Sequence, residues 1–271
     1  MPLNILFIGD VVGSPGRKIV SQVLPRIIPR WDIGLVVCNA ENAAGGSGLT
    51  INCHEELVDA GVDVFTLGDH VYRKDEVFTL FDRSNRLCRP ANFPEDSPGA
   101  EFAIVEAKDG TSVGVFTLLG RTYMRPVDDP FRAANRVIER IGPNVKVILV
   151  DIHAEATSDK QLLGRYLDGR VSAVLGTHTH VATADEQILA RGTAYQTDVG
   201  MTGPYDSILG RRYDRVLEST LSFVPNHFDV ATGDPRLCGA LVEVDPASGR
   251  ASAIRRVQVD GDEARRMMTG G

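Results

Sequence analysis

Acidic, amide and imidazole side chains follow directly after five apolar segments of this chain. They are Asp10, Glu41, Asn42, His70, His153, His178 and His180. Carboxylate oxygens and imidazole nitrogens are ligands that suit zinc, manganese and iron. Burying a polar group without a partner costs free energy. Seven such side chains behind apolar runs are therefore not expected unless they share a ligand. The pattern predicts a site for two metal ions and the chemistry of a hydrolase.

A two-metal site holds its ions about 3.5–4 Å apart and needs an acidic side chain between them. We expect Glu41 to be this bridge. In the segment GTHTH, residues 176–180, the two histidines are spaced by two. In an extended segment both rings would leave on the same side, and each ring would then serve one ion.

These side chains need a fold that brings distant segments together. Apolar segments of strand length alternate with amphipathic segments of helix length up to about residue 180, a pattern typical of a parallel sheet with helices on its faces. The expected strands are 3–8, 35–39, 64–67, 145–150 and 171–175, and the expected helices are 17–28, 54–60, 75–83, 131–141 and 158–167. The crevice outside the carboxyl ends of such strands is where ligands converge.

Three antiparallel hairpins are expected beside this parallel core. They pair 103–107 with 112–118 around an Asp-Gly turn, 188–189 with 193–197, and 239–244 with 251–259. The fold class is therefore α/β, with two facing sheets and helices outside. We expect one domain over residues 1–271, with residues 260–271 as a loose polar tail.

Composition excludes several classes of protein. Apolar residues make up 43% and charged residues 24% of the chain, as in soluble globular proteins. The net charge is −7, and no dense run of lysine and arginine is present, so a binder of long nucleic acids is not expected. No segment approaches the roughly 20 apolar residues that span a membrane. The four cysteines lack a C-x-x-C pair, which favours reduced thiols and a cytoplasmic location. A homo-oligomer is compatible with the sequence, but no segment specifies one.

Several longer motifs carry a family resemblance. GD at 9–10, NAEN at 39–42, GDH at 68–70, DIHAEA at 151–156 and GTHTH at 176–180 resemble the ordered motifs of the calcineurin-like metallophosphoesterase superfamily. NAENAAGGSGLT, GTHTHVATAD and TDVGMTGPYDS resemble most closely its bacterial YmdB-like subfamily, whose members are regarded as phosphodiesterases of 2′,3′-cyclic nucleotides. The resemblance runs nearly end to end and implies a four-layer α/β/β/α sandwich.

The resemblance also implies roles for single residues. One metal would be held by Asp10, Glu41, Asn42 and His180, and the other by Glu41, Asp69, His153 and His178. His70 would protonate the leaving oxygen or steady the phosphate. The ions would be iron or manganese, with zinc as another option. Residues expected to contact the phosphate and ribose are Asn42, Gly45, Gly46 and Thr202.

The predicted reaction is the opening of a small cyclic nucleotide, such as 2′,3′-cyclic AMP, by attack of a metal-bound hydroxide on phosphorus. Two positions depart from the superfamily pattern. Val12 stands where many members carry a histidine, and Asn42 would compensate for it. Asp69 stands where asparagine is usual, so an additional negative charge would strengthen metal binding and make the bound water less acidic.

Two other functions stay open at this stage. Amidohydrolases also combine a His-x-His pair with further histidines and an aspartate, but their His-x-His pair comes first in the chain. A metal-containing signalling or scaffold protein with residual activity is the other, motivated by Asp69. We interpret His54 and His227 as structural or exposed, and the pairs Arg211-Arg212 and Arg255-Arg256 as solvated faces.

Overall fold

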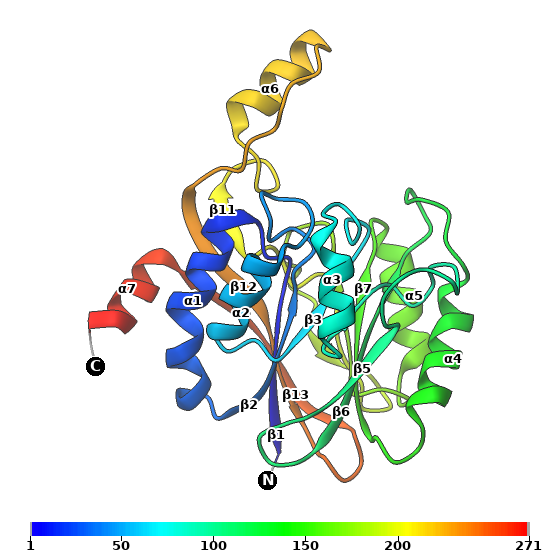
Figure 1. Ribbon diagram of the computed structural model, residues 1–271. Helices are drawn as coiled ribbons and strands as arrows, with labels where there is room; N and C mark the ends of the chain where they lie inside the picture. Colours follow the sequence, from blue (N-terminus) through cyan, green and yellow to red (C-terminus); the bar gives the residue numbers. More distant parts are fainter. Residues whose placement is uncertain (1, 270–271) are drawn as a thin grey trace.

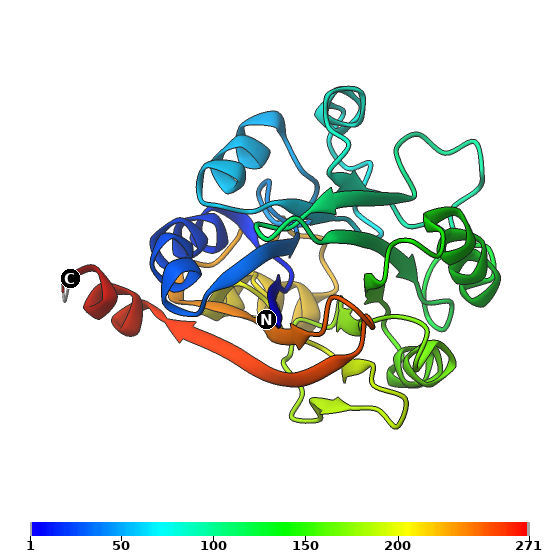
Figure 2. The same cartoon turned by 90° about the horizontal axis from the view of Figure 1, so that it is seen from below.

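The computed structural model describes residues 2–269 and contains two facing sheets with helices on their outer sides (Figures 1 and 2). The first sheet has the order β11-β12-β1-β2-β3-β4, and β13 pairs with β12. Its strands are β1 (Leu3–Ile8), β2 (Ile33–Asn39), β3 (Val64–Thr66), β4 (Leu87–Cys88), β11 (Gly203–Asp206), β12 (Gly233–Val244) and β13 (Ala251–Asp260). Strands β1 to β4 are parallel, while β12 runs antiparallel to β1 with Ile5 opposite Val242.

The second sheet has the order β5-β6-β7-β8-β10-β9. Its strands are β5 (Phe102–Glu106), β6 (Ser112–Leu119), β7 (Val147–His153), β8 (Ala173–Thr177), β9 (Gln187–Ile188) and β10 (Ala194–Gln196). Strands β6, β7, β8 and β10 are parallel, and the edge strands β5 and β9 form antiparallel hairpins. The three expected hairpins and the five expected parallel strands are therefore all present.

Five helices cover the outer faces of the sheets. They are α1 (Gly13–Arg30), α2 (Ile51–Asp59) and α3 (Glu76–Arg83) on the first sheet, and α4 (Pro130–Ile141) and α5 (Thr157–Leu167) on the second (Figure 2). Three separate apolar cores result. Leu3, Ile5 and Phe7 of β1 point between the sheets, whereas Leu6 and Ile8 point toward the helices. This alternation is the period of two that a strand imposes, and it confirms the four-layer sandwich.

The C-terminal segment differs from the expected loose tail. Strand β13 extends to Asp260, and helix α7 (Gly261–Thr269) follows directly. Ala264 is fully buried, and Arg26 of α1 donates a hydrogen bond to the carbonyl of Met267. The tail is polar on average because only one face of this short helix touches α1, so composition alone concealed it. Residues 270 and 271 lie outside the described part of the chain.

A second helix was not expected. Helix α6 (Tyr213–Ser222) has no buried residue and projects from the body on a segment that we call the arm, residues 209–229 (Figure 1). It leaves the same end of the molecule toward which the parallel strands point. Within residues 2–269, no helix is long and apolar enough to cross a membrane.

Candidate metal centre

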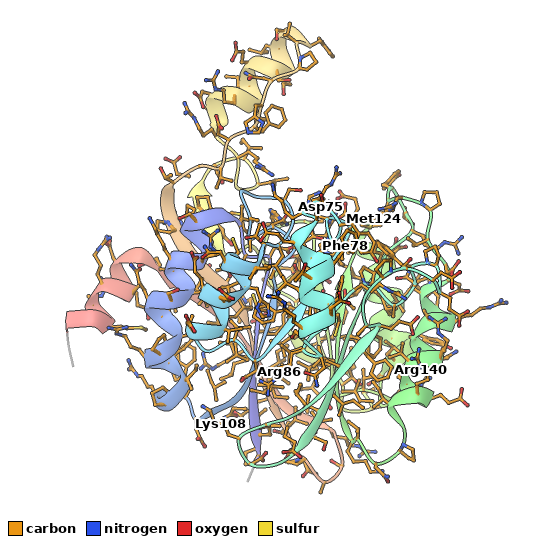
Figure 3. The ribbon with its side chains drawn as sticks, in the orientation of Figure 1. Asp75, Phe78, Arg86, Lys108, Met124 and Arg140 are labelled. Carbon is orange, nitrogen blue, oxygen red and sulfur yellow. The ribbon has the colours of Figure 1, made fainter. Side chains whose placement is uncertain are left out.

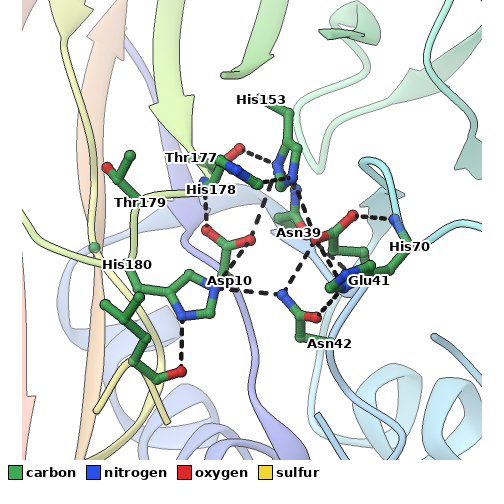
Figure 4. Close-up of polar contacts among 12 residues, drawn as sticks. Asp10, Asn39, Glu41, Asn42, His70, His153, Thr177, His178, Thr179 and His180 are labelled. Carbon is green, nitrogen blue, oxygen red and sulfur yellow. Dashed lines mark hydrogen bonds and ion pairs between the residues drawn. The ribbon is translucent and has the colours of Figure 1, made fainter. Parts of the chain in front are cut away.

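The predicted ligands meet at the carboxyl ends of the central strands of both sheets (Figure 4). Asp10 follows β1, Glu41 and Asn42 follow β2, Asp69 follows β3, and His178 and His180 follow β8, while His153 is itself the last residue of β7. The two sheets face each other, so each contributes one wall. Seven side chains from five strand ends therefore lie close together, and they are the seven that the family resemblance implies as metal ligands.

One compact group within this site can hold a metal ion. Glu41, Asp69, His153 and His178 each offer a ligand atom, and these atoms lie within 4.8 Å of one another. His153 Nε2 is 3.2 Å from Glu41 Oε1 and 3.1 Å from Asp69 Oδ1. His178 Nδ1 is 3.0 Å from the same His153 nitrogen. Two imidazole nitrogens that face each other among carboxylates suit a shared cation.

Asp10 and His180 form a second group of possible ligands, next to the first, and Asp10 Oδ2 accepts from the His178 amide at 3.0 Å. Oxygen Oδ1 of Asp10 is fully buried and has no hydrogen-bond partner among the described residues. It is 3.8 Å from His180 Nε2, and Asn42 Nδ2 is 3.3 Å from that nitrogen. A buried carboxylate oxygen without a donor is costly. A cation here would remove that cost, so these residues fit a metal ion.

Each ligand histidine has its outward nitrogen held by an acceptor, which is the usual support of metal-binding imidazoles. The pairs are His153 Nδ1 with Thr177 Oγ1 at 2.8 Å, His178 Nε2 with Glu155 Oε2 at 3.3 Å, and His180 Nδ1 with the Leu209 carbonyl at 3.2 Å. The remaining nitrogen of each ring faces the site. The sequence analysis missed Glu155, although it stands inside the DIHAEA motif.

Electrostatics keep the acids of this group ionised. Burial opposes ionisation of Glu41, but the charge and hydrogen bond of His153 outweigh it and lower the pKa of Glu41. Burial likewise opposes ionisation of Asp69, and hydrogen bonds from His153 and His178 hold its pKa far below the ordinary value. The same acids raise the pKa of His153 although its burial acts in the opposite direction. A histidine binds a metal ion only through a deprotonated nitrogen, so protonation of His153 and metal binding compete.

A layer of buried polar side chains lies under the ligands, and we call it the polar floor. It consists of Asn39, Thr66, Asp151, Lys160, Thr177 and Asp198. Asp151 accepts hydrogen bonds from Asn39 Nδ2 at 2.9 Å and from the hydroxyls of Thr66 and Thr177 at 2.6 Å each. Burial raises the pKa of Asp151 to about 6 against the opposing effects of His153 and these donors. Thr177 thereby links Asp151 to His153.

The segment 176–180 is held by a buried ion pair. Lys160 Nζ lies 2.7 Å from Asp198 Oδ2, and that oxygen also accepts from the hydroxyl and amide of Thr179. His178 and His180 have φ angles of 91° and 63°, which are uncommon for residues other than glycine. The expectation of an extended segment is therefore wrong. Thr179, anchored between the histidines, holds both in a conformation that costs energy and aims them at different sides of the site.

Gly68, in the loop after β3, allows this loop to approach Glu41 and His153 closely. A Cβ atom at this position would lie 2.4 Å from Glu41 Oε2 and 2.4 Å from His153 Nε2. Any side chain would displace both ligands. The glycine of the GDH motif is thus required by packing rather than by a turn.

His70 lies at the open side of the site, and its side chain is 28% exposed. Its Nδ1 is 2.7 Å from Asn42 Oδ1, and its amide donates to Glu41 Oε2 at 3.0 Å. An amide oxygen only accepts, so Nδ1 carries a proton and Nε2 faces away from Asn42. In this orientation the nitrogen of Asn42, rather than its oxygen, faces Glu41 and His180.

The residues expected to contact the substrate divide into two groups. Gly45 and Gly46 form a turn whose carbonyls accept hydrogen bonds from Arg211 of the arm. Arg211 is half-buried, so its prediction as a solvated residue is wrong. The expectation that the Thr202 side chain contacts the substrate is also wrong. It is fully buried, and its hydroxyl donates to the Cys238 carbonyl and accepts from the Cys238 amide. It supports the sheet and leaves no polar atom for a substrate.

A two-sheet sandwich with acid, amide and histidine ligands at its strand ends is the architecture of the metallophosphoesterases. Within that class, the chain belongs to the YmdB-like family, whose model, described as "YmdB-like protein", matches residues 6–257. This membership confirms the resemblance that the motifs indicated, and it overturns the amidohydrolase alternative.

Known proteins are similar to this chain over 95–99% of its length. A 2′,3′-cyclic-nucleotide 2′-phosphodiesterase of Bacillus subtilis is 45% identical over 260 residues, which are 96% of this chain and 98% of the relative. A crystal structure of a hypothetical protein from Thermus thermophilus is 43% identical, with a TM-score of 0.90 over 95% of this chain and 99% of that one. The crystal structure of a novel phosphatase from Mycoplasma pneumoniae is 30% identical, with a TM-score of 0.90 over 99% of this chain and 97% of that one.

Proposed function

We propose that this protein is a binuclear-metal phosphodiesterase that opens small 2′,3′-cyclic nucleotides. The observation that carries the proposal is that Glu41 belongs to the group with Asp69, His153 and His178 and also accepts from Asn42 Nδ2. The same Asn42 nitrogen lies 3.3 Å from His180 Nε2, which neighbours the unpartnered oxygen of Asp10. The 45% identity to a 2′,3′-cyclic-nucleotide 2′-phosphodiesterase supports the choice of substrate.

The proposed ligand sets divide the site at Glu41. Asp10, Asn42 and His180 would hold one ion, Asp69, His153 and His178 the other, and Glu41 would bridge them. When bound, two divalent ions activate water for attack on phosphorus and neutralise the charge that develops on the phosphate. Iron or manganese is the proposed occupant, because carboxylates, imidazoles and an amide suit these ions without a thiolate.

Asn42 connects one ligand set to His70. An amide can coordinate a cation only through its oxygen, and that oxygen now accepts from His70 Nδ1. Metal binding by Asn42 therefore requires its amide to turn, which is consistent with the ambiguity of amide orientation in hydrogen-bond networks.

His70 is the proposed general acid. In a 2′-directed opening, water leaves a hydroxyl on phosphorus and releases its other proton to solvent, and the bond from phosphorus to O2′ breaks. O2′ takes a proton from Nε2 of the cationic His70 ring, which becomes neutral and later regains a proton from solvent. The product is the 3′-phosphate. His70 suits this role because its ring is the most exposed of the imidazoles in the site, and general acids of this kind contribute roughly 10²–10⁴-fold to the rate.

The first experiment measures metal content by mass spectrometry together with hydrolysis of 2′,3′- and 3′,5′-cyclic AMP. Two ions per chain with opening of the 2′,3′ ring is the expected result. His70→Ala should retain both ions and lose about 10²-fold or more of turnover. His227→Ala is the matched control, since His227 lies on the exposed arm. Normal turnover in His70→Ala would refute the acid role.

A signalling or scaffold protein with residual activity is the second candidate, and Asp69 favours it. Its carboxylate adds a third negative charge to Asp10 and Glu41, which lowers the net positive charge available to acidify bound water. The test is Asp69→Asn. A turnover increase of orders of magnitude over a wild-type rate near background would support this candidate, whereas a decrease would support the phosphodiesterase.

A further inference from the structure

A cavity of about 610 Å³ opens beside the metal centre and is lined by Asp69, Tyr72, Arg73 and Arg125. Asp69 is the point at which the cavity meets the predicted ligands. The cavity volume lies within the range of about 300–1,000 Å³ that small-molecule sites occupy. A nucleotide bound through its cyclic phosphate at the metal centre would therefore extend into this space.

Tyr72 and Arg125, two of the residues that line the cavity, are held in place by neighbouring aromatic rings. The Tyr72 ring stacks on Phe78 at 5.5 Å between centroids and 12° between planes, and its hydroxyl donates to the Pro98 carbonyl. Arg125 lies over the Phe93 ring at 5.4 Å. Figure 3 shows Phe78 of α3 and Met124, the neighbour of Arg125, at the same end of the molecule. Segments from α3 and from the loop before α4 thus close around one space.

Arg73 is positioned from a different direction. It follows the His70 loop, and its amide donates to the His70 carbonyl. A Cβ atom at Gly48 would lie 3.1 Å from the Cβ of Arg73, so the glycine-rich turn packs directly against this residue. Arg73 therefore stands between the turn that faces the metal centre and the cavity.

The charge of the cavity is not neutralised within the described residues. Several other arginines, such as Arg17, Arg212 and Arg236, lie within 4 Å of an acidic side chain. Arg73 and Arg125 form no ion pair with any acid in residues 2–269. Asp69 is the one acidic side chain in the lining, and it is engaged by His153 and His178. Two guanidinium groups without a counter-charge favour an anionic ligand, and their planar fork matches a phosphate.

We propose that Arg73 and Arg125 bind a second phosphate of the substrate, on the 5′ side of the nucleotide whose 2′,3′-cyclic phosphate lies at the metal centre. The preferred substrate class is then a nucleotide that carries both groups. Such groups come either from a nucleoside with a free 5′-phosphate or from the cyclic-phosphate end of a short oligoribonucleotide. This inference rests on the proposed phosphodiesterase function.

The test compares three substrates in the metal-loaded full chain: adenosine 2′,3′-cyclic phosphate, its 5′-phosphorylated form, and the dinucleotide adenylyl-adenosine with a 2′,3′-cyclic end. The expected kcat/KM ratio of a doubly phosphorylated substrate to the simple one is about tenfold or greater, as charged hydrogen bonds imply. The advantage should shrink as salt rises, because exposed charges are screened. The better of the two doubly phosphorylated forms identifies the source of the second phosphate.

Variants locate the effect. In Arg73→Ala/Arg125→Ala the ratio should fall toward one. In Arg86→Ala, an exposed arginine that lies below Phe78 and Met124 in Figure 3, it should keep its wild-type value. Calorimetry supplies a readout without turnover. Adenosine 3′,5′-bisphosphate should bind about tenfold tighter than adenosine 3′-phosphate to the wild type, and equally to the double variant.

The outcomes separate this inference from the proposed function. Opening of the simple cyclic nucleotide with a wild-type ratio near one, or an unchanged ratio in the double variant, overturns the second-phosphate site alone. Opening of none of the three substrates overturns the proposed phosphodiesterase. In that case a retained calorimetric preference for the bisphosphate still supports the arginine site, and its loss overturns the site as well.

Discussion

The polar floor and the arm differ in how far their side chains are buried and in how many contacts they make with the rest of the fold. Every member of the floor is fully buried or nearly so and is hydrogen-bonded within the fold, with Asp151 and Asp198 as its centres. Helix α6 of the arm has no buried residue, and Leu221 and Phe223 are 74% and 91% exposed. The floor orients ligand histidines, whereas the arm touches the site only at its base, through Leu209 and Arg211.

This difference indicates which residues fix the orientation of the side chains in the candidate metal centre. A buried polar network rigidifies the groups that it satisfies, and each member that is lost leaves another unpaired. An exposed helix with few contacts opens at little cost in free energy. Substitutions in the floor should therefore change both stability and metal binding, and those at the tip of the arm should change neither.

The largest expected effect is that of Asp198→Ala, which removes the partner of the buried Lys160. Breaking a buried ion pair from one side costs roughly 3–5 kcal/mol of unfolding free energy. Urea denaturation measures this loss. The double variant Asp198→Ala/Lys160→Met is the control and should recover part of it, since no unpaired charge remains. If Asp198→Ala alone lowered the unfolding free energy by less than about 1 kcal/mol, the polar floor would not be a major source of stability.

A smaller and more selective effect is expected of Thr177→Val. This change keeps the side-chain shape but breaks the link between Asp151 and His153, so metal affinity should fall by about 10–100-fold. Thr66→Val is the matched control, because Thr66 bonds Asp151 through an equally short contact and has no bond to His153. Both should lose about 1–3 kcal/mol of stability. Equal metal affinities in a metal titration would show that Thr177 does not orient the ligand.

The smallest effect is expected at the tip of the arm. Leu221→Ser together with Phe223→Asn should change the unfolding free energy by no more than about 0.5 kcal/mol and leave metal content unchanged. Asparagine suits position 223, where φ is 58°. Arg211→Met at the base is the contrast and should weaken substrate binding by loosening the Gly45-Gly46 turn. A loss of stability in the tip variant would show that the arm is covered in solution.

Much of the fold was predictable because strand and helix periods were locally clear. The five parallel strands, three hairpins and five flanking helices follow from apolar patterns that each element satisfies by itself. Helix α6 was missed because no buried face produces a pattern, and α7 because a short helix on one partner looks polar. The order of strands in each sheet depends on pairing between distant segments, which no local pattern encodes.

The site divides in the same way. Most of the proposed ligands could be predicted because they stand at the end of an apolar run, where ionisable groups are conspicuous, whereas Asp69 was predicted from the family resemblance alone. Lys160 and Asp198 were missed because a lysine on an amphipathic helix is usually solvent-exposed, and its burial depends on a partner 38 residues away. Thr202 was misassigned because its motif neighbours the site while its hydroxyl is directed into the sheet.

The pairing of β1 with β12 has a consequence for folding during synthesis on the ribosome. Strand β1, Leu3–Ile8, is synthesised well before its antiparallel partner β12, which spans Gly233–Val244. At roughly 5–20 residues per second, the edge of β1 waits on the order of tens of seconds for β12 to leave the ribosome. An open edge of apolar residues readily pairs with other chains. Nascent or prematurely terminated chains should therefore depend on chaperones far more than the finished protein does.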